Sequence, residues 1–348
     1  MKKIIYSIAL GLAFLSVLSC KKADPVEPPM YQDPSKADDA GARNGLQSSY
    51  DDIEDVYNSN EYATSANLRT TGTNTILPCG SVTFNTNNFT INYSASGINC
   101  GSRVLSGTID VTLVSGTKFS DAGAKLRIVY TNYKVLYTHS NQSVIYNGTT
   151  YTTNVSGGTL LTLFTNTPNA EVIHTVRGDL TLTFDTLGAS GFDRSWKVFR
   201  KKTYQNTPGT VTGITLQVEG DTLLAANNSH MTGTYNNVTE MGMSMKNDKF
   251  VCNVPTPFRW ENCGTSYAGP YTLKQGKVEF TSYFTSGILY TLGYTKATWG
   301  ATAGYRYDGP GVYTLDGGCG SNGYKIDASI VNPTTNASLY NSSEFIFY

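Results

Sequence analysis

The sequence predicts a mainly β fold of antiparallel, sandwich-like units, in two related halves, preceded by one short amphipathic helix. Two observations lead to this class. Charged residues make up only 15% of the chain, whereas Tyr (24) and Gly (34) are abundant, which suits half-buried strands and the turns between them. From about residue 77 onward, β-branched and aromatic runs alternate with turn residues every 8 to 12 residues or so, as in sandwiches and barrels.

A signal segment precedes the β region. Residues 1–19 begin with two lysines after Met1 and continue as an apolar run, Ile4 to Leu18, that is shorter than the roughly 20 residues a membrane-spanning helix needs. The sequence Val-Leu-Ser-Cys at 17–20 resembles the lipobox of bacterial lipoproteins. This resemblance implies that the chain is cut before Cys20 and that Cys20 is the lipid attachment site, which makes the membrane a partner through the acyl chains.

The residues after Cys20 predict a tether and an envelope location. The stretch KKADPVEPPMYQ contains three prolines, so residues 20–34 are expected to be extended. By resemblance to lipoproteins of bacteria with two membranes, Lys21 favours the outer membrane. Surface export in Bacteroidota often uses an acidic stretch here, and this segment offers only Asp24 and Glu27. The periplasmic and cell-surface faces therefore both stay open.

A short amphipathic helix is expected within residues 35–60, chiefly over 46–57. Apolar residues recur there at helical spacing and define one face, namely Leu46, Tyr50, Ile53 and Tyr57. Gly41 and Gly45 weaken the segment before it. The same stretch carries an acidic face of Asp51, Asp52, Glu54 and Asp55. We interpret this face as solvated rather than as a cation site, because a run of charges usually faces solvent.

Two related β units are predicted, over residues 75–205 and 206–348. The stretch at 90–114 resembles the stretch at 312–331, since each contains a strand, a turn with Cys-Gly-Ser and a second strand. Within these units, hairpin turns are expected at Asn147-Gly148, which is a type I′ signal, at Asn247-Asp248 and at Gln275-Gly276.

Five cysteines follow Cys20, and an oxidising compartment makes disulfides the default expectation. The repeat favours equivalent bridges Cys79–Cys100 and Cys263–Cys319, which leave Cys252 spare. A Cys252–Cys263 bridge is the competing pairing, and the sequence leaves the choice open.

Several stretches resemble those of uncharacterised lipoproteins of Bacteroidota: DDIEDVY, CGSVTFN, SGINCGSRVLSGTIDVTL, PFRWENC and DGGCGSNGYKIDAS. Members of that family share the lipobox, a short acidic helix, many Thr-rich strands and a late Gly-x-Cys turn. The resemblance implies an architecture and an envelope location. It implies no activity, because none is established for the family.

The sequence contains no recognisable catalytic constellation. The histidines His139, His174 and His230 have no metal-ligand spacing, and we find neither a nucleophile elbow nor a phosphate-binding glycine loop. With the two lysines of the signal removed, 24 basic residues face 26 acidic ones, so charge gives no case for a nucleic-acid partner. We therefore expect neither catalysis nor a cofactor.

One methionine-rich stretch offers a minor alternative, a copper site. Met241, Met243 and Met245 alternate along an expected strand and so share a face, and His230 lies upstream. Thioether and imidazole groups are ligands for Cu(I). We favour the simpler interpretation, in which methionine fills gaps beside a strand.

The expected function is that of a lipid-anchored, non-catalytic binding or structural module. Its ligand is unknown, with a glycan or a protein captured by loops or by a tyrosine-bearing face as the working idea. One alternative is a glycan-active enzyme with a dispersed Asp/Glu pair, since such acids need only meet in space. The other is an envelope scaffold with no small ligand. The oligomeric state is left open.

Overall fold

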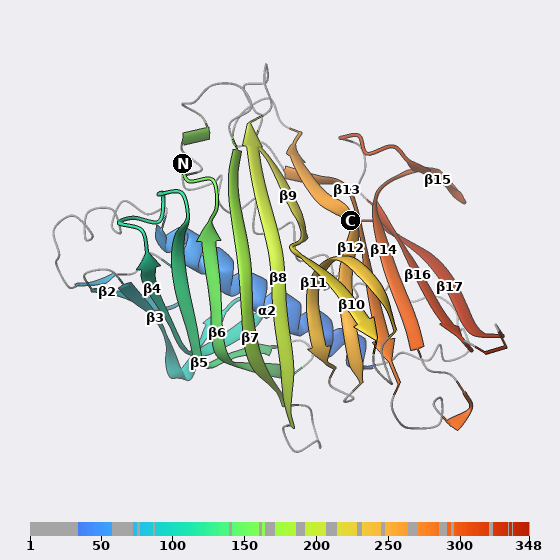
Figure 1. Cartoon of the computed structure of the whole chain (residues 1–348), viewed down its shortest axis with the longest axis horizontal. Coiled ribbons are helices and arrows are strands. Elements are labelled where there is room, and N and C mark those ends of the chain that lie inside the picture. Colours follow the sequence, from blue (N-terminus) through green and yellow to red (C-terminus); the bar gives the residue numbers. More distant parts are fainter. Residues whose placement is uncertain are drawn as a thin grey trace.

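The computed structural model of the chain describes residues 34–57, 72–74, 77–85, 88–138, 141–159, 162–163, 171–185, 192–206, 214–227, 232–244, 248–263, 271–284, 291–293, 296–319, 323–332, 334–335 and 337–347. These residues form the helix α2 and 17 strands, and the predicted mainly β, antiparallel fold with a helix near the N-terminus is confirmed (Figure 1). The signal segment and residues 20–33 of the tether lie outside the described residues. No described helix is long and apolar enough to cross a membrane.

The first half of the chain contains α2 (Pro34–Tyr57), β1 (Gly72–Asn74), β2 (Ser81–Asn85), β3 (Asn88–Cys100), β4 (Arg103–Ser115), β5 (Ala124–Tyr137), β6 (Gln142–Asn154), β7 (Glu171–Asp185) and β8 (Phe192–Asn206). The second half contains β9 (Ile214–Gly220), β10 (Thr222–Asn227), β11 (Thr232–Met243), β12 (Lys249–Asn262), β13 (Tyr271–Tyr283), β14 (Lys296–Gly309), β15 (Val312–Leu315), β16 (Gly323–Val331) and β17 (Ser338–Phe347).

Strands β2 to β9 form an antiparallel meander, and the sheet then branches. One end of β8 pairs with β9 and the other end with β11, and both of these strands pair in turn with β12. The order continues through β13, β14 and β16 to β17, while β15 folds back on the far end of β14.

The predicted boundary between two β units, at residues 205 and 206, lies at the end of β8, which ends at Asn206. Hydrogen-bonded pairing continues across it, from β8 to β9 and β11. The two stretches that resemble each other also differ in pairing. β3 pairs directly with β4, whereas β15 and β16 both pair with β14.

The helix is longer than the segment 46–57 expected from its apolar spacing, since α2 has 24 residues and begins at Pro34. At about 1.5 Å per residue it spans roughly 36 Å. It lies across the strands against one face of the sheet, which we call the inner face (Figure 1). The helical side buried there comprises Ala42, Leu46, Tyr50, Ile53 and Val56.

The two glycines that weaken the helix in the sequence allow its close approach to the sheet. The hydroxyl of Tyr137 donates a hydrogen bond to the carbonyl of Gly41 at 2.7 Å, and the hydroxyl of Tyr146 donates to the carbonyl of Ala42 at 2.6 Å. A Cβ atom at Gly45 would lie 3.1 Å from Cγ2 of Val135 and closer still to the Tyr146 hydroxyl. Tertiary contacts therefore override the weak helix propensity of this stretch.

Two of the three predicted turns lie inside strands, so those predictions are wrong. Gly148 belongs to β6 and pairs with Tyr130 of β5 and Leu180 of β7. The preceding Asn147 instead accepts a hydrogen bond, at 2.8 Å, from the backbone of Asn132, where β5 shifts register. Gly276 belongs to β13 and faces an irregular part of β12. The Asn-Gly and Gln-Gly pairs thus accommodate bulges, which like turns use positive φ.

Candidate functional site

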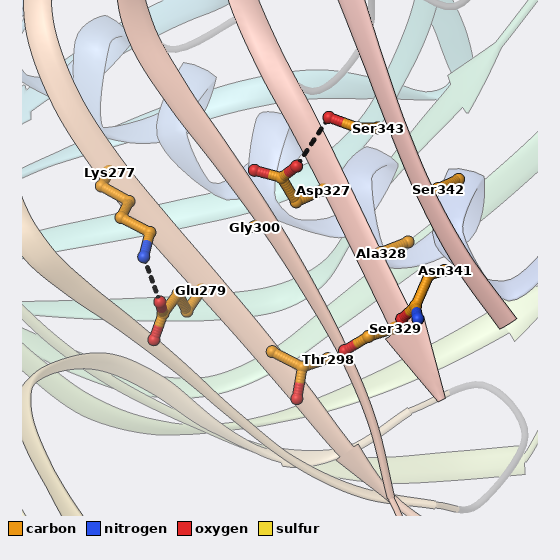
Figure 2. Close-up of a pocket in the computed structure, with 10 residues that line it drawn as sticks. All are labelled: Lys277, Glu279, Thr298, Gly300, Asp327, Ala328, Ser329, Asn341, Ser342 and Ser343. Carbon is orange, nitrogen blue, oxygen red and sulfur yellow. Dashed lines mark hydrogen bonds and ion pairs between the residues drawn. The ribbon is translucent and has the colours of Figure 1, made fainter. Parts of the chain in front are cut away.

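A groove crosses the outer face of the C-terminal strands, the face that points away from α2 (Figure 2). Side chains alternate along a strand, and Phe280 and Trp299 turn inward, so Glu279 and Gly300 face outward. The groove has a volume of about 490 Å³ and is lined by Lys277 and Glu279 of β13, Thr298 and Gly300 of β14, Asp327, Ala328 and Ser329 of β16, and Asn341, Ser342 and Ser343 of β17.

Gly300 forms the floor of this groove. It lies in register between Glu279 on one side and Asp327 on the other, and Ser343 continues the same row. A Cβ atom at Gly300 would have as its nearest neighbour the carbonyl oxygen of Val278, at 3.5 Å. The missing side chain therefore leaves open space between two carboxylates.

The charges that border the groove are balanced in pairs. Lys277 lies 2.6 Å from Glu279, and Lys325 lies 2.9 Å from Asp327 (Figure 2 shows the first pair). The hydroxyl of Ser343 also donates a hydrogen bond to Asp327, at 2.8 Å. Partial burial alone would raise the pKa of Asp327, but the hydrogen bonds from Lys325 and Ser343 outweigh it and lower the pKa. The rim is thus polar without a net charge.

An aromatic cluster continues the outer face beyond the groove. Phe345 stands two residues after Ser343 and therefore on the same side of β17, about 7 Å further along. Its ring stacks on Tyr313 with 4.0 Å between ring centroids, and Tyr305 contacts it edge-on at 5.1 Å. Tyr313 and Tyr307 belong to the β14–β15 hairpin and are 36% and 51% exposed. We call Tyr305, Tyr313 and Phe345 the aromatic platform.

The groove and the platform together suit a polyhydroxylated ligand. The groove supplies carboxylate, amide and hydroxyl groups, which accept and donate hydrogen bonds. The platform supplies large, rigid apolar rings of the kind that pack against the non-polar side of a ligand. Concave sites with a few convergent polar groups beside apolar surface are typical ligand sites. The sequence contains a weak signal for the polar part, since Lys-x-Glu at 277–279 and Lys-x-Asp at 325–327 each place two charges on one strand face.

A second cluster of charges lies on the inner face, between α2 and the sheet. Arg43 Nε lies 2.6 Å from Glu240 Oε2, and Arg200 contacts the other oxygen of the same carboxylate. Arg200 also donates a hydrogen bond to Gln47 Oε1, at 2.9 Å. The Arg43 guanidinium stands 4.7 Å from the ring centroid of Phe280. Because the Glu240 carboxylate pairs with both guanidinium groups in the interior, we assign this cluster a structural role.

The acidic side of α2 is not the solvated face predicted from the charge run. The hydroxyl of Tyr93 on β3 donates to Asp52 at 2.5 Å, and Lys202 on β8 pairs with Glu54 at 3.0 Å. Burial raises the pKa of Asp51 to about 7 and that of Asp52 to about 6, against the opposing effects of Lys202 and Tyr93 respectively. Strands on two sides of the helix therefore leave these acidic residues only half-exposed, although local sequence assigned them to solvent.

Burial also raises the pKa of Asp55 to about 7, with the charges of Asp52 and Glu54 adding to the effect. Glu54 differs from its neighbours. Burial alone would raise its pKa, but the charge of Lys202 and the hydrogen bonds from Lys202 and Tyr204 outweigh it and hold the pKa below its ordinary value. His174 packs between Phe119 and Tyr204, and burial lowers its pKa to about 4, so its ring is neutral at pH 7.

The cysteines form the two disulfides expected from the repeat, Cys79–Cys100 and Cys263–Cys319. Cys252 is free and buried in β12. It stands in register opposite Glu240, and burial raises the pKa of its thiol.

The structure describes two of the four candidate copper ligands. Met241 and Met243 are half-buried on β11, and Met241 packs against a small cluster of Val238, Val251 and Tyr283. His230 and Met245 lie outside the described residues, as does Cys20. Among the described residues, no group of three or more His, Cys, Asp or Glu is arranged to hold a metal ion.

Comparison with known proteins found no match: no family model, no curated protein and no solved structure is similar to this chain.

Proposed function

We propose that this protein is a lipid-anchored outer-membrane lipoprotein that binds a neutral saccharide in the groove over Gly300, without catalysis. The observation that carries the proposal is the continuity of a charge-balanced polar groove with the aromatic platform on one sheet face. The lipobox at Cys20 supports the anchor.

The pairing of charges supports a neutral ligand over an anionic one. Each lysine at the groove already has a carboxylate partner, so a phosphate or sulfate group would have to displace Glu279 or Asp327. A sugar hydroxyl can donate to these carboxylates while the ion pairs persist.

The experiment measures binding of neutral and acidic oligosaccharides to the full mature chain by calorimetry. Gly300→Val places a β-branched side chain on the groove floor, where the nearest neighbour of a new Cβ is 3.5 Å away, so the strand tolerates it. We expect binding to weaken at least about tenfold, equivalent to ~1.4 kcal/mol. Phe345→Ala is expected to weaken binding similarly.

Thr175→Val, on the outer face of β7, is the matched control and is expected to leave affinity unchanged. Equal affinity of Gly300→Val and the unmodified chain would contradict the site. Binding of acidic glycans alone, lost with added salt, would contradict the ligand class.

A second candidate function is glycoside hydrolysis with inversion. Glu279 and Asp327 flank Gly300 across two strand spacings, about 9.6 Å between Cα atoms, which approaches the roughly 6.5 to 9.5 Å between the carboxyl groups of inverting enzymes. Against it, a general acid needs a raised pKa, and the pKa of Asp327 is lowered. Release of reducing ends by the unmodified chain, abolished in Glu279→Gln, would favour hydrolysis over binding alone.

A further inference from the structure

Strand β17 forms an edge of the sheet, and most of its length carries few features that block pairing with another strand. Within the described part of the chain it pairs with β16 alone, and it lies at the border of the sheet (Figure 1). Its ten residues, SLYNSSEFIF, include one charged residue, Glu344, and neither lysine nor proline, and its register shift against β16 lies near its start, between Ser338 and Tyr340. Natural edge strands are usually blocked by such residues, by bulges or by a covering element. Asn341, Ser343 and Glu344 are exposed along it.

We infer that two copies of this chain associate through antiparallel pairing of their β17 strands. A two-fold axis perpendicular to the sheet brings the same face of both copies to the same side, as an isologous interface requires. In the register centred on Ser343, Glu344 lies opposite Ser342 of the other copy and Phe345 lies opposite Asn341. The one charged residue of the strand therefore meets no like charge.

This pairing joins the two grooves into one site. Asn341 and Ser343 line the groove and also stand on β17, so each copy places its own pair of these residues at the seam. The outer faces of two sheets then form one surface, with a platform and a groove on each side. A ligand long enough to reach both grooves gains from the second contact without a second loss of translational freedom. The association itself does not depend on the proposed ligand.

Variants of the full mature chain that carry charges of one sign on β17 test the inference. Asn341→Lys with Ser343→Lys makes one doubly basic variant, and Asn341→Asp with Ser343→Asp makes a doubly acidic one. In the doubly basic variant, a lysine of one copy lies opposite a lysine of the other copy whether the two-fold axis passes through residue 341, 342 or 343. We expect a dimer for the unmodified chain by sedimentation, monomers for each variant alone, and a dimer again when the two are mixed.

Circular dichroism of each variant checks that a monomer is folded, so that recovery on mixing separates pairing from misfolding. Ser343→Cys gives an independent measurement, since paired strands bring the two copies of this position within disulfide range. In cells we expect a reducible band of twice the mass.

A monomeric unmodified chain, together with a Ser343→Cys variant that forms no cross-link, would overturn the inference, because the edge is then covered by the chain itself. Cross-linking of the Ser343→Cys variant to a different protein would overturn it in favour of another partner. Neither result bears on the calorimetric test of the groove.

Discussion

Arg43 of α2 and Glu240 of β11 are 197 positions apart in the chain, and their side chains meet at 2.6 Å in the interior. Glu240 also contacts Arg200, and all three side chains are at most 12% exposed. Burial alone would raise the pKa of Glu240, but Arg200 and Arg43 outweigh it and hold the pKa low. A single carboxylate thus compensates two buried cations and joins the helix to two strands.

Glu240→Gln should therefore destabilise the protein strongly. The variant leaves two buried guanidinium groups without a counter-charge, which typically costs about 3 to 5 kcal/mol. Urea unfolding followed by tryptophan fluorescence measures the loss. Glu279→Gln removes an exposed ion pair on the outer face and should cost less than about 1 kcal/mol. Similar losses for both variants would show that burial of the Glu240 cluster does not matter.

Asp51→Asn should make the protein more stable at neutral and alkaline pH. The pKa of Asp51 is about 7 in the folded state and near 3.8 when unfolded, so the folded state binds the extra proton between these values. The contribution of Asp51 to the free energy of unfolding is greatest below about pH 4 and decreases as the pH rises to about 7.

The difference between Asp51→Asn and the unmodified chain should accordingly be near zero at pH 4. It should reach about 2 kcal/mol at pH 8, a discounted value because the side chain keeps some contact with water. Asp179→Asn is the control, since that side chain is 75% exposed, and it should show no such trend. A difference that is constant with pH would refute the raised pKa.

Gly45→Ala should destabilise the protein although alanine favours helix. The new methyl group would meet the Tyr146 hydroxyl and Val135, and overpacking costs typically about 1 to 3 kcal/mol. The gain in helix propensity is only about 1 kcal/mol. Asn44→Ala, one residue earlier in α2, should be neutral or stabilising. Thermal unfolding compares the two, and a higher midpoint for Gly45→Ala would contradict the close packing.

Loss of the Cys263–Cys319 disulfide should cost more stability than loss of Cys79–Cys100. The first joins residues 56 positions apart and the second joins residues 21 apart. On the chain-entropy relation these loops contribute about 4 and about 3 kcal/mol. Paired Cys→Ser variants, Cys263/Cys319 and Cys79/Cys100, compared by denaturant midpoint, test the order. A larger loss for the shorter loop would contradict it.

Cys20→Ala should release the protein from the membrane fraction and abolish acyl labelling, if Cys20 carries the lipid. Cys252→Ala serves as the control, because Cys252 is buried and should leave the protein membrane-bound. Membrane recovery of Cys20→Ala would contradict the anchor. Protease treatment of intact cells then separates the two possible locations, since only a cell-surface domain is cut while periplasmic markers stay whole.

Local sequence predicted well those features that local chemistry decides. The β-branched and aromatic runs predicted strands, and the spacing of Leu46, Tyr50 and Ile53 predicted the buried side of the helix. The Asn-Gly signal at 147–148 failed because the same positive-φ chemistry serves a hairpin turn and a bulge equally. The acidic face of α2 was misjudged because its partners, Tyr93 and Lys202, lie on strands far along the chain.

By itself, the sequence determined the fold class, the position of the helix and the cysteines available for pairing, because each depends on residue type and short-range period. The tertiary structure decided the groove, whose floor and walls come from β13, β14, β16 and β17. It also decided which charges of α2 contact the sheet. The physical reason is common to both: strand register determines which distant side chains share a face, and register is a property of the pairing between strands rather than of any one strand.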